Sequence, residues 1–206
     1  MIDVKSLRTE PYVWIHLSGI VFVPICLGIT TIGVGMAENY PVLELSLLAV
    51  TGILPVLLMQ LTRPFDIFSV LFLSLKPESL SEERKTILCL FKTFSQKLVS
   101  TIAAGIMLVV LWLLYRLSPL TWGTIDFVPY PQIIGSIAAA IAFYASNLFL
   151  QVPLSVLLVL KTKPAKLAQT QAYPLEDIQK NFTVPGIKVN KILWFLKSED
   201  SSIETV

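Results

Sequence analysis

Four long apolar runs constrain this chain more than any other feature of its sequence. An α-helix needs roughly 20 apolar residues to cross the hydrocarbon core of a bilayer, and each run has at least that length. The runs cover residues 12–35, 42–61, 98–117 and 132–160. The sequence therefore predicts an all-α integral membrane protein with four transmembrane helices.

The composition supports a bilayer rather than water as the surrounding solvent. Hydrophobic residues make up 54% of the 206 residues and charged residues 15%, against roughly 25% charged in a typical soluble domain. A soluble fold of this size cannot bury so much apolar surface. The net charge of +2 is too small to indicate nucleic acid. Membrane lipids are the predicted surroundings, and nucleic acid is not a predicted partner.

The basic residues are distributed unevenly between the two sides of these helices. Two lie before the first run, six in the loop 62–97 and seven in the tail 161–206, so that only Arg116 falls on the other side. Cytoplasmic loops carry an excess of Lys and Arg. Both termini are therefore predicted to be cytoplasmic, with a transmembrane domain over 1–160 and a cytoplasmic tail over 161–206.

The loop 62–97 has two parts. Residues 63–75 are apolar but too few to cross, which is typical of a re-entrant or interfacial segment. Ser79 and Glu82 then form a capping-box pattern. The residues after it recur near helical spacing and predict an amphipathic helix on the membrane: Ile87, Leu88, Leu90, Phe91 and Phe94.

The tail changes character along its length. Residues 167–186 are polar with two prolines and are expected to form an extended linker. A second apolar patch follows, led by Trp194 and Phe195. A solvated tail has no need of such a patch, so we expect it to anchor the tail to the membrane or to a partner.

Prolines and small residues predict how the helices bend and pack. Pro24 should kink the first helix, and Pro153 should break or tilt the last turns of the fourth. Ala138, Ala142 and Ser146 recur at four-residue intervals, and such stripes let helices approach closely. The sequence leaves open whether the neighbour belongs to this chain or to a partner.

Two charged residues lie within the four runs, Glu44 in the second and Arg116 in the third. Such residues are functional candidates in a membrane. Both lie near an interface, where long side chains reach water. A structural Glu44–Arg116 pair is the interpretation that we prefer over a functional site.

His16, the only histidine, lies about one turn inside the first run. One interpretation is an axial ligand to chlorophyll, which needs a single ligand, whereas a bis-histidine haem site needs two. The commoner role is an interfacial histidine bonded to a backbone carbonyl. Whether a pigment such as chlorophyll or carotenoid binds is left open by the sequence.

The sequence contains no P-loop, HExxH, CxxC, GxSxG or dinucleotide-binding motif, and the middle of the four runs is almost wholly apolar. We therefore expect no enzymatic activity. A small homo-oligomeric transporter or channel is the alternative, and polar residues open to water at mid-membrane would favour it. A lipid-modifying enzyme, which needs a cluster of His, Asp or Glu at the cytoplasmic face, is a third reading.

The opening from Ile2 to His16 resembles that of a cyanobacterial family, the low-complexity tail membrane proteins. Four further blocks are similar to shared blocks of that family: 52–55, 63–65, 75–78 and 87–92. The resemblance covers roughly residues 1–160, and the tail is the variable part. It implies a home in a photosynthetic (thylakoid) membrane beside a photosystem or its assembly intermediates. No catalytic residues come with it, and a non-enzymatic accessory or assembly subunit is the function that it implies.

Overall fold

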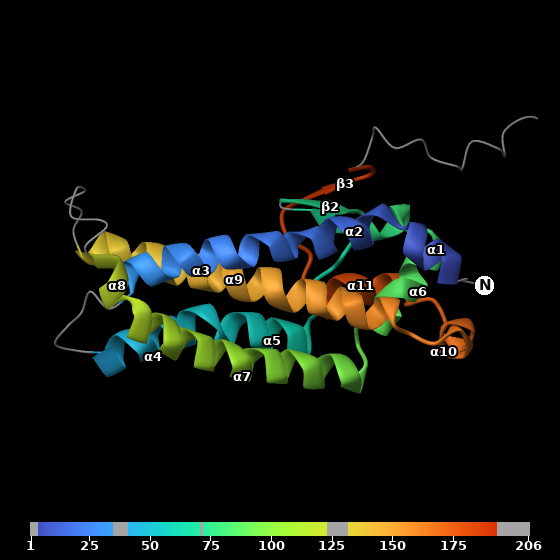
Figure 1. Cartoon of the computed structure of the whole chain (residues 1–206). Coiled ribbons are helices and arrows are strands. Elements are labelled where there is room, and N and C mark those ends of the chain that lie inside the picture. Colours follow the sequence, from blue (N-terminus) through green and yellow to red (C-terminus); the bar gives the residue numbers. More distant parts are fainter. Residues whose placement is uncertain (1–3, 35–40, 71, 123–131, 193–206) are drawn as a thin grey trace, which may run out of the picture.

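The computed structural model describes residues 4–34, 41–70, 72–122 and 132–192. Four helical stretches in it are long and apolar enough to cross a membrane, and each overlaps one predicted run. They run from Pro11 to Gly33, Pro41 to Thr62, Phe94 to Leu117 and Ile133 to Leu160. The prediction of an all-α membrane protein with four spanning helices is confirmed (Figure 1).

The first spanning stretch is interrupted close to Pro24. A short helix α1 (Val4–Thr9) precedes it, and α2 (Pro11–Ser18) is followed by a 3₁₀ turn, η1 (Gly19–Val21), and then by α3 (Phe22–Gly33). A proline lacks the N–H that would bond the carbonyl four residues earlier. The 3₁₀ turn therefore lies just before Pro24, as the sequence predicts.

The other spanning helices differ in whether the helix continues through its proline. The second stretch divides at Ile53 into α4 (Pro41–Gly52) and α5 (Leu54–Thr62), with a proline in the first turn of α5. The third stretch is α7 (Phe94–Leu117), followed by α8 (Pro119–Trp122). The fourth, α9 (Gln132–Leu160), continues through Pro153, so Pro153 does not break it, and a tilt of its last turns stays a prediction. Val152 and Val156 flank this proline and are buried, and their packing holds the turn in place.

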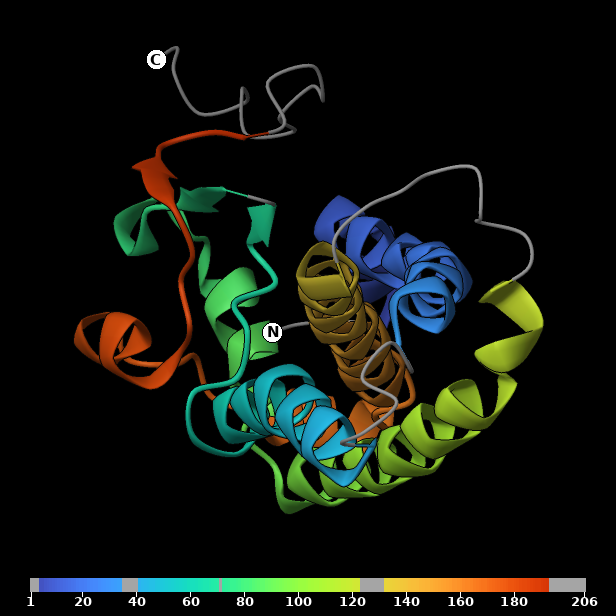
Figure 2. The same cartoon turned by 90° about the vertical axis from the view of Figure 1, so that its left-hand side faces the viewer.

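Helix α9 lies at the centre of the bundle, with α3, α4, α5 and α7 packed around it (Figure 2). Its Phe143 is fully buried and fills the space beside Gly52, where a Cβ atom would approach the ring to 2.5 Å. The core of the bundle consists of Val34, Leu48, Ile53, Ala104, Met107, Leu111, Ala139 and Phe143. Exposed aliphatic side chains such as Ile29, Val109 and Ile141 point outward, where lipid tails solvate them.

A second core lies at one end of the bundle, beside α1. It gathers apolar side chains from α1, α2, the loop after α5, the end of α9 and the tail. The tail forms α10 (Pro164–Gln169) and α11 (Leu175–Asn181), and the loop forms η2 (Pro77–Ser79) and α6 (Glu82–Leu90) (Figure 1). The extended linker expected over 167–186 is therefore wrong. Leu167, Ile178 and Phe182 are buried in this core and hold the tail against the loop.

A small sheet connects the loop to the tail. Its strands are β1 (Ser69–Val70), β2 (Leu73–Leu75) and β3 (Ile187–Val189), in the order β1-β2-β3. The first pair is antiparallel and the second parallel, with Leu73 opposite Ile187 and Leu75 opposite Val189. No period-two alternation long enough to indicate these short strands is present in the sequence, and they were not predicted.

A shorter helix, α6, covers only the first part of the predicted amphipathic segment and ends at Leu90, while Phe94 begins α7. Ser81, not Ser79, caps α6 by accepting a hydrogen bond from the Arg84 N–H. Ile87 and Leu88 are buried in the second core, so this face packs on the protein's own chain rather than on the membrane.

Candidate functional site

Three segments far apart in the sequence form one body at the end of the bundle. They are residues 4–13, the loop 63–93 and the tail 161–192, and we call this body the platform. Its segments share the second core and the β2–β3 pairing. The N-terminal arm, the middle loop and the described tail therefore lie at one end of the bundle, where most basic residues are located.

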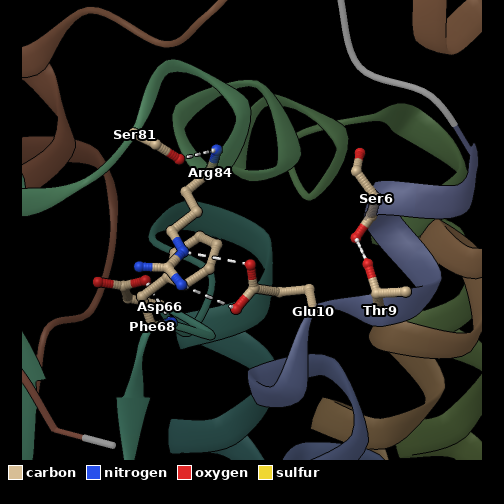
Figure 3. Close-up of polar contacts among 7 residues, drawn as sticks. All are labelled: Ser6, Thr9, Glu10, Asp66, Phe68, Ser81 and Arg84. Carbon is tan, nitrogen blue, oxygen red and sulfur yellow. Dashed lines mark hydrogen bonds and ion pairs between the residues drawn. The ribbon is translucent and has the colours of Figure 1, made fainter. Parts of the chain in front are cut away.

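An ion pair ties the N-terminal arm to α6 (Figure 3). The Arg84 Nε lies 3.2 Å from Glu10 Oε2, and its Nη2 lies 3.4 Å from Oε1. The guanidinium also lies over the rings of Tyr12 and Phe68, at 5.6 Å and 5.7 Å from their centroids. Arg84 thus holds the start of the first span, the loop and α6 together through charge and ring contacts.

Asp66 is a buried carboxylate at the contact between loop and tail. It is 1% exposed, and its Oδ1 accepts a hydrogen bond of 2.9 Å from the Phe68 N–H. Its own N–H donates to the Thr183 carbonyl at 3.0 Å. Burial raises the pKa of Asp66 to about 6, and the Phe68 hydrogen bond limits that rise. The signal that could have revealed it is a single acidic residue inside the apolar segment 63–75.

Two basic side chains fix α11 of the tail to the loop. The Arg63 Nη2 donates to the carbonyls of Gln179 and Phe182, at 2.7 Å and 3.1 Å. The Lys92 Nζ donates to Asn181 Oδ1 at 2.9 Å. Cations are favourable at the C-terminus of a helix, where carbonyls are left without partners in the helix. These basic residues therefore dock the tail on the loop.

His16 makes the contact with a backbone carbonyl that is the commoner of its two predicted roles. Its Nδ1 lies 2.8 Å from the Tyr12 carbonyl oxygen, and its ring lies 5.6 Å from that of Phe65. The backbone of Ser69 is a second polar neighbour of the ring. The loop thus covers His16, and its role as a chlorophyll ligand stays a prediction.

The small-residue stripe of α9 is rotated from the predicted one. Ala142 and Ser146 are buried, as a packing stripe requires, but Ala138 is exposed, and the buried alanine is Ala139. Ala138 therefore does not pack within this chain, and its packing against a partner stays a prediction. A four-residue interval on a helix of 3.6 residues per turn drifts around the axis, so three such positions do not share one contact.

Helices α3 and α9 approach each other closely at Gly33. A Cβ atom on Gly33 would lie 2.3 Å from the Gly135 carbonyl oxygen and 3.1 Å from the Ala139 Cβ. Two backbones come this close only when small residues face each other. At this point, the neighbour of the stripe is another helix of the same chain.

The predicted Glu44–Arg116 pair stays a prediction. Glu44 is buried in the first turn of α4. Arg116 lies in the last turn of α7, and its guanidinium carbon lies 5.5 Å from the centroid of the Trp112 ring. Trp194 and Phe195 lie outside the described residues.

Four amide side chains are buried among α5, α7 and α9. Gln96 Nε2 donates to the Ser155 carbonyl at 2.9 Å, and Asn147 Nδ2 donates to the Phe143 carbonyl of its own helix at 3.0 Å. Within the described part of the chain, five amide atoms of this group have no hydrogen-bond partner: Gln60 Nε2, Gln96 Oε1, Asn147 Oδ1, and Nε2 and Oε1 of Gln151. The sequence pattern that could have shown two of them is the spacing of Asn147, Gln151 and Ser155 by four on α9.

Metal chemistry has no cluster to support it in the parts of the chain that the structure describes, where no three His, Cys, Asp or Glu residues gather. Cys26 and Cys89 are both free thiols. The platform can instead bind through its surface. Ion pairs and ring contacts hold its segments together, and apolar side chains remain exposed at its edge.

Comparison with known proteins identifies the family. The family model described as low-complexity tail membrane protein-like matches residues 9–194, which extends well into the tail. No curated protein and no solved structure matches the chain. Since the match covers most of the 206 residues, the chain belongs to the low-complexity tail membrane protein-like family.

Proposed function

We propose that this protein is a non-enzymatic accessory or assembly subunit of a photosynthetic membrane complex. It would lie in the thylakoid membrane with both termini in the cytoplasm, next to a photosystem or one of its assembly intermediates. Family membership and the excess of basic residues at the platform end support this placement.

The observation that carries the proposal is the folded platform. A tail that served only as a solvated extension would not bury Ile178 and Phe182 or bind its α11 to Arg63. Ordering these residues costs conformational entropy. A surface that is already ordered binds a partner at a lower entropic cost, so the folded tail suits a docking function. The apolar pair Trp194 and Phe195 follows directly after this ordered tail.

The experiment that tests the proposal removes those two anchors from the full-length protein. A tagged Trp194→Ala/Phe195→Ala double variant should insert normally and lose co-purification with photosystem polypeptides by about tenfold or more, since buried aromatic anchors contribute most to an interface. Ser201→Ala/Ser202→Ala, in the same tail, is the matched control and should co-purify like the unaltered protein. Equal recovery of both variants would contradict an anchor at these residues.

A second candidate function, a small homo-oligomeric transporter or channel, is favoured by the buried amides. Unpaired amide atoms in a membrane interior are costly, and water in the bundle would satisfy them. The discriminating test is Gln151→Cys in a Cys26→Ser/Cys89→Ser background. Modification by a small water-soluble thiol reagent, with Val109→Cys on the lipid face left unmodified, would support a hydrated path. Equal protection of both cysteines would argue against transport.

A further inference from the structure

We infer that the small sheet binds lipid and that its tip inserts into the membrane interface beside the helix bundle. The tip consists of Phe72, Leu73 and Ile187, which are 77%, 39% and 68% exposed. Two of these residues come from the loop and one from the tail. The inference is independent of which complex the protein joins.

The first observation is the depth of the sheet. The Phe65 ring lies 5.6 Å from the ring of His16, and the Ser69 backbone is also a neighbour of that ring. His16 follows the start of the first spanning stretch, Pro11, by five residues, which is a rise of about 7–8 Å along a helix. The sheet therefore starts at a level that the first spanning helix has already entered.

The second observation is the direction in which the sheet projects. In Figure 1, β2 and β3 lie at the level of α2 along the length of the bundle, rather than beyond its end. Figure 2 looks along the helices and shows the sheet to one side of them. A sheet placed laterally at this level continues the lipid-facing surface of the bundle, so its exposed apolar tip meets the membrane interface.

The third observation is the charge beside the tip. Lys76, Lys188 and Lys191 are exposed on or next to the strands β2 and β3. Apolar side chains flanked by lysines are the combination that binds an interface, because the apolar groups enter the acyl boundary and the lysines meet anionic headgroups. A bilayer with anionic lipids is the partner that this chemistry fits.

The backbone holds loop and tail together at the tip. The Ile187 N–H donates to the Phe72 carbonyl at 2.7 Å, and Ser74 Oγ donates to the Pro185 carbonyl. Gly186 between them has a φ of +72°, and the position of a Cβ atom there is already occupied by the Phe72 carbonyl oxygen. Only glycine fits this turn. The tail therefore reaches the membrane through the same element that joins it to the loop.

The test measures the depth of Phe72 in the full-length chain. A spin label on Phe72→Cys, in the Cys26→Ser/Cys89→Ser background, is placed in vesicles of neutral lipid with anionic phosphatidylglycerol. Collision with oxygen, which concentrates in lipid, is compared with collision with a water-soluble nickel chelate. Glu78→Cys, exposed on the platform, provides the water reference, and Val109→Cys on α7 provides the lipid reference.

We expect the ratio of oxygen to nickel collisions at position 72 to exceed that at position 78 and to approach that at position 109. A ratio equal to that at position 78 would overturn the inference, since the tip would then lie in water. Protection from both reagents would overturn it as well, because a second copy of the chain would then cover the tip. Ile187→Cys, on the tail side, should give the same ratio as position 72 and guards against a local effect of one variant.

Discussion

The Arg84 Nε lies 3.2 Å from Glu10 Oε2, and this pair joins side chains 74 positions apart in the sequence. Glu10 lies directly before the first spanning stretch, whereas Arg84 lies on α6 of the loop. The carboxylate is largely shielded from water, at 11% side-chain exposure. The pair therefore fixes α6 of the loop relative to the start of the first spanning stretch.

Removing the guanidinium should release α6 from the N-terminal arm. We expect Arg84→Leu to lower the free energy of unfolding in detergent by about 1–3 kcal/mol, because Glu10 is left shielded and without its partner. Lys85→Leu is the matched control, since its partner Glu82 is an exposed neighbour on the same helix, and its effect should stay under about 0.5 kcal/mol. Equal effects of the two variants would show that the Glu10–Arg84 pair has no structural importance.

Gly33 should be intolerant of any larger residue, because the backbones of α3 and α9 lie close together there. Gly33→Val would drive its Cβ into the Gly135 carbonyl and should cost about 1–3 kcal/mol. Gly28→Val on the same helix is the control, because nothing lies within 4 Å of its Cβ position. Thermal unfolding in detergent measures both, and a Gly33 variant as stable as the Gly28 variant would contradict this helix contact.

The stability of the platform should depend on pH through Asp66. Burial raises its pKa from 3.8 to about 6, so the folded state binds a proton more tightly than the unfolded state does. Its contribution to stability is therefore fully present below about pH 4 and is lost as the pH rises through 6. A pKa difference of about two pH units corresponds to about 3 kcal/mol.

Asp66→Asn isolates this effect, because asparagine keeps an acceptor for the Phe68 N–H and does not titrate. Unfolding of both proteins is followed between pH 4 and pH 7. We expect the unaltered protein to lose stability relative to the variant as the pH rises, and to show no further relative change above about pH 7. Parallel profiles would mean that Asp66 is solvated in the folded state.

The orientation in the membrane is open to direct labelling. Cysteines at Glu83 and Gln169, both exposed on the platform, should react from the cytoplasmic side with a membrane-impermeant reagent. A cysteine at Thr124, between α8 and α9, should react from the opposite side. Labelling of Glu83→Cys and Thr124→Cys from the same side would contradict the four-span topology.

The spanning helices could be predicted because their signal is local. Length and lack of charge define each run without reference to the rest of the chain. The outcome at each proline was harder to predict, since Pro24 and Pro153 carry the same local signal. Pro153 lies between the buried Val152 and Val156, and α9 continues through it.

The platform could not be predicted because its contacts are not local. The sheet pairs Leu73 with Ile187, and a three-residue strand has too little pattern to indicate a partner more than a hundred residues away. The polar sequence of the tail suggested a linker, yet Leu167, Ile178 and Phe182 are buried and hold it against the loop. A charge such as Glu10 at a membrane edge is ordinary, so nothing in the sequence distinguished it as half of an ion pair.

The central claim, an accessory subunit of a photosynthetic complex, is tested most directly by native electrophoresis of gently solubilised thylakoid membranes containing the tagged full-length protein. Mass spectrometry of each band then identifies what migrates with it. We expect the protein in a band far larger than its own 22.9 kDa mass, together with photosystem or assembly-intermediate polypeptides. A protein that migrates alone, or only with copies of itself, would contradict the claim, and the latter result would favour the homo-oligomeric transporter.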